Sequence, residues 1–186
     1  MSSEETALIQ RLKQGDEEAF EQIFRRYQKR VYNVAYRMIS NRETAEDMTQ
    51  EVFLRVFQKI RKFKGKSSFS TWLYRLTVNL CLDHLRKRNA HPTESLEDIE
   101  EKALVYGKTP EDDVILEERR EAVQRIISSL PDKLRAIIIL REIEGLSYKE
   151  LAEAMNCSMG RVKSLLYEAR MELRRRIERN KHLFKE

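Results

Sequence analysis

Glycine and proline are scarce in this chain, whose 186 residues include five Gly and three Pro. Turn-rich β architectures need many such residues, so their scarcity favours helices. The only two cysteines, Cys81 and Cys157, exclude a disulfide framework and fit a reducing cytosol. The N-terminus lacks the basic start and apolar core of a signal peptide, and the longest aliphatic run, residues 136–140, is far below the ~20 residues that span a bilayer. We therefore expect a soluble, cytoplasmic protein without membrane insertion.

Groups for catalysis are equally sparse. The sequence has no Gly-rich phosphate loop, no nucleophile–base pair and only three His. Cys81 and His84 have the spacing of two metal ligands on a helix, but no second pair accompanies them. We expect no enzyme activity, no cofactor, no metal and no small-molecule substrate.

Charged residues, in contrast, make up 36% of the chain, against ~25% in average globular proteins. Residues 1–88 carry 18 Lys/Arg and 11 Asp/Glu, residues 89–118 carry 2 and 10, and residues 119–186 carry 16 and 10. Two basic blocks around an acidic connector indicate two separate contacts with an anionic partner, nucleic acid being the first candidate. A highly charged helical protein without such a partner would have the same composition.

Apolar residues recur every three or four positions in the first part of the chain, which is typical of amphipathic helices. We predict one helix with Asp16 as its N-cap, a second after the capping-box spacing of Ser40 and Glu43, and a third over about residues 70–88. Together they form a domain of residues 1–88. The core-facing positions include Phe20, Ile23, Phe24, Tyr27, Val31, Met38, Ala45, Met48, Val52, Phe53, Val56, Phe57 and Ile60, then Phe69, Trp72, Leu73, Leu76, Leu80 and His84 on the third helix.

The acidic connector, residues 89–117, breaks this periodicity and is predicted as a largely extended linker with a helical turn around 95–104. A helix from near Val114 to Ser129 follows, and Pro131 opens another helix that ends at Gly145. The predicted fold is all-α: two small helical domains, 1–88 and 118–186, joined by the acidic linker.

The clearest local motif is LSYKELAEAMNCSMGRVKSLL, residues 146–166. Ser147 and Glu150 have capping-box spacing. Ala152 is the small residue at which the two helices of a helix-turn-helix can cross closely. Asn156, four residues later, occupies the turn position that requires a positive φ. These features predict a helix-turn-helix.

The second helix of this motif, residues 158 to about 177, is the expected reader of a DNA major groove, packed back through Val162 and Leu166. The same spacing also occurs in helical hairpins whose basic face is merely solvated. The candidate DNA contacts are Ser158, Arg161, Lys163, Ser164, Tyr167 and Arg170, with Arg174, Arg175 and Arg176 extending the positive charge.

Lysines and small polar residues are followed directly by aromatic residues in FKGKSSFSTWLY, residues 63–74. Opening of DNA strands needs this mixture, with cations for the phosphates and an aromatic face or pocket for an unstacked base. Trp72 is expected as a core residue rather than as a stacking platform, and Asp83 can simply pair with Lys87 one turn on. The candidate contacts are Lys64, Lys66, Ser67, Ser68, Arg75, Asn79 and Arg86.

A third set of side chains forms an acidic and polar stripe on the second helix, away from its core-facing side. Such a stripe is a poor contact for DNA and a good one for protein, with plain solvated surface as the alternative. Its members are Asp47, Gln50, Glu51, Leu54, Arg55 and Gln58.

Three segments, in the same order and spacing, resemble the extracytoplasmic-function (ECF) group of bacterial sigma factors, which direct RNA polymerase to promoters. TAEDMTQEVFLRVF, residues 44–57, resembles region 2.2 of that family. SSFSTWLYRLTVNLCLDHLRKR, residues 67–88, resembles regions 2.3–2.4, and residues 130–170 resemble region 4. The resemblance covers roughly residues 16–88 and 115–178.

This resemblance implies a role for each candidate set. Region 2.2 docks on the β′ clamp helices of core polymerase, which assigns Asp47, Gln50, Glu51, Leu54 and Arg55 to polymerase binding. Residues 64–68 correspond to the loop that captures a flipped base of the minus-10 element. Asn79 and its polar neighbours would read or hold the same single strand of DNA. Region 4 places residues 158–176 in the major groove of the minus-35 element and its upstream helices on the β flap. The family also implies an anti-sigma factor as a partner.

The recognition helix departs from the family pattern Gly-Thr-Val-Lys-Ser-Arg-Leu-His-Arg-Ala-Arg. Arg161, Leu165, Tyr167 and Glu168 stand where the family has Thr, Arg, His and Arg. Glu168 could accept a hydrogen bond from a cytosine amino group, or pair with Arg161 or Arg175. The promoter preference of the family therefore does not carry over to this chain.

Two other functions fit parts of the sequence. A stand-alone helix-turn-helix regulator would bind duplex DNA by itself, commonly as a dimer on a palindrome. An all-helical adapter that binds only protein would use Asp47 and Gln50 but leave both basic faces without a role. The expected function is that of a sigma factor, which melts promoter DNA by binding unstacked bases better than paired ones.

Overall fold

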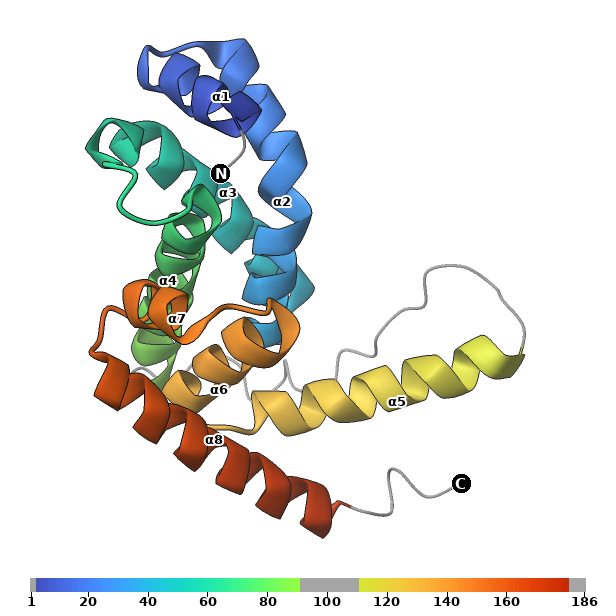
Figure 1. Ribbon diagram of the computed structural model, residues 1–186. Coiled ribbons are helices and arrows are strands. Elements are labelled where there is room, and N and C mark those ends of the chain that lie inside the picture. The colour runs from blue at the N-terminus through green and yellow to red at the C-terminus, as the bar shows by residue number, and fades with distance from the viewer. Residues whose placement is uncertain (1–2, 91–110, 181–186) are drawn as a thin grey trace.

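The computed structural model describes residues 3–90 and 111–180, and every regular element in these ranges is helical, which confirms the predicted all-α class (Figure 1). We call residues 3–90 the first half and residues 111–180 the second half. The first half contains α1 (Ser3–Lys13), α2 (Glu17–Ile39), α3 (Arg42–Lys59), the 3-10 turn η1 (Ile60–Lys62) and α4 (Phe69–Ala90). The second half contains α5 (Glu111–Ser128), α6 (Asp132–Ile138), the π-helical turn η2 (Ile139–Ile143), α7 (Tyr148–Ala154) and α8 (Met159–Arg179).

Helix α5 begins inside the segment predicted as an extended linker through residue 117. The linker prediction is therefore wrong for residues 111–117, and the helix predicted from near Val114 begins three residues earlier, at Glu111. The predicted turn around 95–104 lies outside the described residues.

The four helices of the first half enclose an apolar cluster that we call the first-half core. Helix α1 was not predicted, yet it buries Leu8, Ile9 and Leu12 in this cluster. Their spacing is helical, but a segment of three apolar residues is too short to show a repeating stripe. The buried members are Leu8, Ile9, Leu12, Ala19, Ile23, Tyr27, Val31, Val52, Phe53, Val56, Ile60, Phe63, Phe69, Leu73 and Leu80.

Side-chain caps set where α2 and α3 begin. The Asp16 carboxylate accepts a hydrogen bond from the Ala19 amide at 3.0 Å, as predicted for an N-cap. The predicted capping box from Ser40 is wrong, because Ser40 ends α2 in a left-handed conformation with φ +61. Asn41 is the N-cap of α3 instead, and its side chain accepts from the Thr44 amide at 2.8 Å. Only these two residues join α2 to α3, so Ser40 reverses the chain direction and Asn41 caps the start of α3.

Helix α4 is buried on two faces rather than on the one predicted. One face, including Phe69, Leu73 and Leu80, packs in the first-half core. The other faces the second half, and it carries four residues at heptad-like spacing. These four residues are Tyr74, Val78, Cys81 and Leu85.

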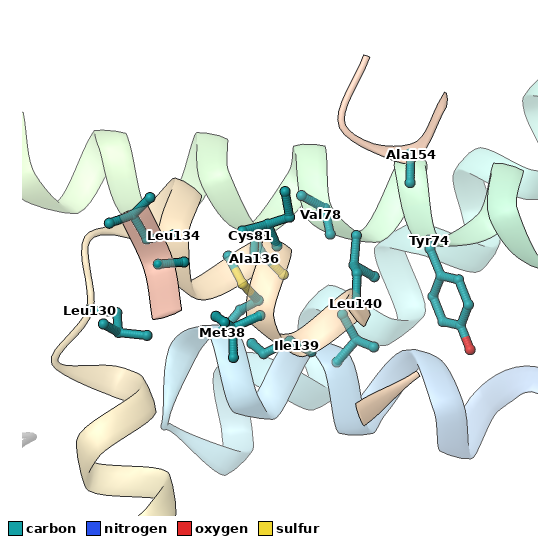
Figure 2. Close-up of a cluster of buried hydrophobic side chains, with 14 of the residues drawn as sticks. Met38, Tyr74, Val78, Cys81, Leu130, Leu134, Ala136, Ile139, Leu140 and Ala154 are labelled. Atoms are coloured by element: carbon teal, nitrogen blue, oxygen red, sulfur yellow. The ribbon is translucent and has the colours of Figure 1, made fainter. Parts of the chain in front are cut away.

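A second apolar cluster, the shared core, therefore contains side chains from both halves. Figure 2 shows Met38 of α2 and Val78 and Cys81 of α4 beside Ala136 and Ile139 from the second half. In Figure 1, α7 lies across α4 and α6 lies between α4 and α8. The halves thus form one packed body within the described residues.

The turns of the second half follow their sequence signals. Pro131 is the N-cap of α6 and Gly145 has φ +73, as expected for the residue after a helix. The π-helical turn between them was not predicted. The Ser147 hydroxyl and Glu150 carboxylate form the predicted capping box, and hydrogen bonds from Ser147 lower the pKa of Glu150.

Arg135 of α6 is 7% exposed and joins the two halves. Its guanidinium donates to the carbonyl oxygen of Met38 at the end of α2. It also donates to the carbonyl oxygens of Ser128 and Leu130, the latter at 3.0 Å. Burial lowers the pKa of this group. One buried cation therefore satisfies carbonyl groups at the ends of α2 and α5 that have no partner inside their own helices.

Candidate nucleic-acid and polymerase interfaces

The helix-turn-helix has the predicted geometry at its turn and at the start of α8. Asn156 has φ +51, and Ser158 caps α8 by accepting a hydrogen bond from the Arg161 amide at 3.2 Å. Val162 and Leu166 are buried in the shared core. The fully buried alanine of α7 is Ala154; Ala152, the predicted crossing residue, is half-buried, and its carbonyl accepts from the Cys157 amide at 2.9 Å.

The N-terminal half of α8 presents the predicted DNA contacts to solvent. Arg161, Lys163 and Ser164 are exposed, and Tyr167 is 71% exposed. Within the described residues, neither the Arg161 guanidinium nor the Lys163 ammonium has a hydrogen bond or ion pair. These two cations could therefore bind a phosphate or a base edge without first breaking a contact within the chain.

The C-terminal half of α8 differs, because its arginines already contact groups of this chain. Arg170 pairs with Glu142 of η2 at 2.8 Å, and this contact raises the pKa of Arg170. Arg175 pairs with Glu172 at 2.7 Å rather than with Glu168, and Arg174 lies 3.5 Å from Glu178. The predicted extension of positive charge is thus largely neutralised within the helix.

Arg176 has a structural contact that the sequence did not suggest. Its guanidinium donates to the hydroxyl and the carbonyl of Ser129, at 2.8 and 2.9 Å, and pairs with Glu172. It therefore ties α8 to the turn between α5 and α6.

The loop before α4 exposes both predicted lysines. Lys64 and Lys66 flank Gly65, whose φ of +67 makes the tight turn possible. Ser67 is half-buried. Ser68 is used differently: its hydroxyl accepts from the Thr71 amide at 3.1 Å and so caps α4.

The remaining predicted contacts of this surface lie along α4. Arg75 and Asn79 are exposed. Arg86 pairs with Asp83 at 3.2 Å, so the expected alternative pairing of Asp83 with Lys87 is not the one formed. Within this surface, the exposed cations without an acidic partner are those nearest to the loop.

Trp72 is half-buried and combines the expected core position with an accessible face. Its ring lies 5.3 Å from that of Phe63 and 5.7 Å from that of Phe69, so one part belongs to an aromatic cluster. The rest lines a pocket of about 660 Å³ between the two halves. The pocket is lined by Lys66, Ser67, Thr71, Trp72 and Arg75 of the first half, and by Lys149, Ala152, Glu153, Asn156, Cys157, Ser158 and Met159 of the second.

The polar stripe of α3 faces solvent, as predicted. Asp47 and Gln50 are exposed, and Leu54 is 57% exposed. Glu51 and Arg55 form an ion pair at 2.8 Å, which fixes the middle of the stripe. These side chains form a continuous surface of mixed polarity on one helix.

Phe57 was predicted to face the core but is 52% exposed. It stands three residues after Leu54 and so continues the α3 stripe. Its ring packs edge-on against Phe20 of α2, with 5.7 Å between ring centroids. The stripe thus ends in an aromatic contact surface, which the Leu54–Phe57 spacing could have indicated.

No grouping of three or more His, Cys, Asp or Glu residues suited to a metal occurs in residues 3–90 and 111–180. Burial raises the pKa of the Cys81 thiol to about 12 and lowers the pKa of His84. None of the helices in the described ranges has both the length and the apolarity needed to cross a bilayer.

The sequence matches two family models, Sigma-70 region 2 over residues 23–91 and Sigma-70, region 4 over residues 120–173. It is 37% identical to the ECF RNA polymerase sigma-E factor of Haemophilus influenzae, a match that covers 92% of this chain and 94% of that protein. It is 36% identical to the ECF RNA polymerase sigma factor SigW of Bacillus subtilis, covering 91% of this chain and 94% of the relative.

Solved structures with the same fold include CnrH in complex with the cytosolic domain of CnrY. That match has a TM-score of 0.69 at 20% identity, over 92% of this chain and 96% of CnrH. The sigma factor RpoE of Bartonella quintana, in complex with the anti-sigma factor NepR, matches with a TM-score of 0.65 at 23% identity, over 86% of this chain and 96% of the other. Both matches extend over most of each chain and show a shared fold.

Proposed function

The chain belongs to the ECF group of the sigma-70 family and directs promoter recognition by RNA polymerase; from this we propose how its surfaces divide the task. The observation that carries the proposal is the separation of three chemically different surfaces on three elements. They are the α3 stripe, the loop of residues 64–67 with the adjoining part of α4, and the N-terminal half of α8.

The α3 stripe is the proposed docking surface for the β′ clamp helices of core polymerase. Two exposed apolar side chains, Leu54 and Phe57, lie beside the exposed Asp47 and Gln50. Protein interfaces combine an apolar centre with a polar rim in this way. We add Phe57 to the predicted contacts for that reason.

The loop of residues 64–67 is the proposed DNA-opening surface, together with Arg75 and Asn79. Lys64 and Lys66 can hold phosphates, and the exposed Asn79 amide can donate to and accept from one base. The partly accessible Trp72 ring offers a face for an unstacked base. Strand separation then follows from tighter binding of unpaired bases than of paired ones.

The N-terminal half of α8 is the proposed reader of the minus-35 element. Arg161, Lys163, Ser164 and Tyr167 project from the first turns of a capped helix, the part that meets base edges in helix-turn-helix complexes. The upstream helices of the second half are the proposed contact for the β flap.

Further partners and the cellular location extend this proposal. CnrH and RpoE were solved with the cytosolic domain of CnrY and with the anti-sigma factor NepR, respectively. By analogy we propose an anti-sigma factor as a partner of this chain, and the cytoplasm as its location. Sigma factors are initiation factors, so we expect the polymerase, and not this chain, to supply all catalysis.

Transcription from promoters of the native genome by core polymerase, with and without this chain, tests the proposal. We expect Lys64→Ala with Lys66→Ala to lower open-complex formation about tenfold while leaving polymerase binding intact. Lys29→Ala, on the exposed side of α2, is the matched control. Tight binding of duplex DNA by the chain alone, without promoter-dependent transcription, would instead indicate a stand-alone regulator.

A further inference from the structure

The end of α3 carries three cations that belong to none of the proposed contact surfaces. Lys59 is the last residue of α3, and Arg61 and Lys62 lie in the 3-10 turn η1 that follows it. All three side chains are exposed, and none has an acidic partner among residues 3–90 and 111–180. We call Lys59, Arg61 and Lys62 the η1 cations.

The sequence around the η1 cations contains no acidic residue. Between Glu51 and Asp83 it has seven Lys or Arg and neither Asp nor Glu. On α2, by contrast, the exposed Arg26 pairs with Glu4 of α1 at 3.2 Å. Cations that stay unpaired and close together repel one another, which destabilises the fold. A highly anionic partner would offset this repulsion, so the segment is suited to one.

The local backbone directs these cations to solvent. Ile60 and Phe63 are 2% and 4% exposed, and they are three residues apart, the spacing at which side chains of a 3-10 helix lie on one side. Lys59 and Lys62 have the same spacing and share a different side, which is exposed. From α1, the Lys13 ammonium lies 5.7 Å from the centroid of the Phe63 ring. A fourth cation is therefore near the η1 cations.

The η1 cations continue the proposed DNA-opening surface. Lys62 is two residues before Lys64, so their Cα atoms are at most about 7 Å apart. One DNA strand carries a phosphate about every 3.4 Å along the helix axis. One DNA molecule can therefore contact the loop of residues 64–67 and the η1 cations at the same time. This end of α3 lies beside α1, away from α8 (Figure 1).

The chemistry of this segment suits double-stranded rather than single-stranded DNA. Proteins hold single strands by stacking bases on aromatic side chains in addition to binding phosphates. The aromatic residue next to η1, Phe63, is buried against Phe69 and Trp72. The η1 cations therefore have no accessible ring of their own on which a base could stack, but they can bind the phosphates of a duplex.

We propose that the η1 cations bind the phosphates of the promoter duplex directly beside the segment that is opened. The inference rests on the proposed function, because it needs the loop of residues 64–67 to hold the opened segment. The two sets of cations then act at different steps. The η1 cations strengthen binding of the closed duplex, whereas Lys64 and Lys66 act when the strands separate.

The salt dependence of promoter binding tests the proposal in the complex of core polymerase with the full-length chain. Lys59→Ala, Arg61→Ala and Lys62→Ala are combined in one variant, and its affinity for a duplex promoter fragment is measured from about 50 to 200 mM salt. Each lost phosphate contact should reduce the slope of log affinity against log salt by about 0.9. Over this range the native complex should therefore lose about fortyfold more affinity than the variant.

Two controls separate phosphate binding from other effects. Arg25→Ala with Lys29→Ala and Arg30→Ala removes the same charge from exposed positions of α2 and should leave the native slope. Lys59→Arg with Arg61→Lys and Lys62→Arg keeps the charges and should also keep it. If the triple alanine variant does not fold, Lys62→Ala alone should still lower the slope by about 0.9.

The choice of duplex over single strand has its own measurement. Binding of the complex to the isolated single strand of the minus-10 segment should weaken with Lys64→Ala and Lys66→Ala, and should be unchanged in the triple alanine variant. Equal weakening of single-strand and duplex binding by the triple variant would overturn the assignment to duplex DNA. Weaker assembly with core polymerase in the absence of DNA would show that the η1 cations contact protein instead.

The remaining outcomes distinguish this inference from the proposed function. If the native chain supports transcription and the triple alanine variant keeps the native salt slope, the inference alone is wrong. If the native chain supports no promoter-dependent transcription, the proposed function is wrong and this inference is wrong with it.

Discussion

The N-terminal half of α8 carries two basic residues and the C-terminal half five, but the two halves differ in how many of these charges lack an acidic partner. In the N-terminal half, Arg161 and Lys163 have no acidic partner within the described residues. In the C-terminal half, Arg174 and Arg175 face acids one turn away, and Arg170 is held by Glu142. Positive charge in the sequence is therefore not the same as positive charge that DNA can reach.

The surface proposed to open DNA also has unpaired cations at one end, in the loop before α4, and a paired cation at the other end, along α4. Lys64 and Lys66 are exposed in the loop and have no acidic partner among residues 3–90 and 111–180, whereas Arg86 is paired with Asp83 further along α4. Ser68 is a hydrogen-bond acceptor in a helix cap rather than an open polar group. Matched substitutions can compare a side chain that is open to solvent with one that is already bonded within the chain. They test whether only the open side chains contribute to function.

The largest effect is expected from the free cations of α8. Arg161→Ala with Lys163→Ala should reduce promoter-dependent transcription by about ten- to hundredfold, since each base or phosphate contact contributes about 1–3 kcal/mol. Arg174→Ala with Arg175→Ala removes the same charge and should lower transcription by less than about threefold. Transcription with core polymerase at fixed salt measures both. Equal losses from the two pairs would show that internal pairing does not determine which arginines contact DNA.

A smaller effect is expected on folding from Arg176. Arg176→Ala removes the bonds to Ser129 and should lower the free energy of unfolding by about 0.5–1.5 kcal/mol, because α8 loses its hydrogen bonds to the turn between α5 and α6. Arg175→Ala breaks only an exposed pair with Glu172 and should change it by less than about 0.5 kcal/mol. Urea denaturation followed by circular dichroism gives both values. An equal loss of unfolding free energy from both variants would show that the contacts of Arg176 with Ser129 do not stabilise the fold.

The smallest effect concerns the two serines before α4. Ser68→Ala should lower the free energy of unfolding by about 1 kcal/mol, the usual contribution of a serine N-cap. Ser67→Ala should leave stability within about 0.5 kcal/mol of the native chain and affect only open-complex formation. Thermal unfolding and a promoter-opening assay on the same two proteins distinguish these roles. The assignment fails if Ser67→Ala is the less stable of the two.

Local sequence patterns predicted most of the helices and their ends. The capping box at Ser147 and Glu150 and the positive φ of Asn156 are confirmed, because each depends on residues within one turn of chain. Helix α1 was not predicted, because three apolar residues are too few to establish a helical periodicity. Phe57 was placed in the core because its apolar character, and not its angular position on α3, was given weight.

The packing of the two halves could not be predicted in this way. Tyr74, Val78, Cys81 and Leu85 give α4 a second apolar face, but that pattern does not name the surface covering it. The partner of Arg135 lies 97 residues earlier in the chain, and nothing local to either residue indicates the contact. The exposed cations could be listed from the sequence, whereas the pairing of Arg170 with Glu142, 28 residues earlier, could not be predicted.

The burial of Cys81 has a chemical consequence. Its thiol is fully enclosed in the shared core, and desolvation raises its pKa to about 12 (Figure 2). The thiolate is the nucleophile that reacts with alkylating reagents, so at neutral pH this residue can be modified only in molecules whose core has opened. Cys157 is half-buried and serves as an internal reference for reagent activity in the same sample. The modification rate of Cys81 therefore reports how often the unaltered protein opens, without any introduced label.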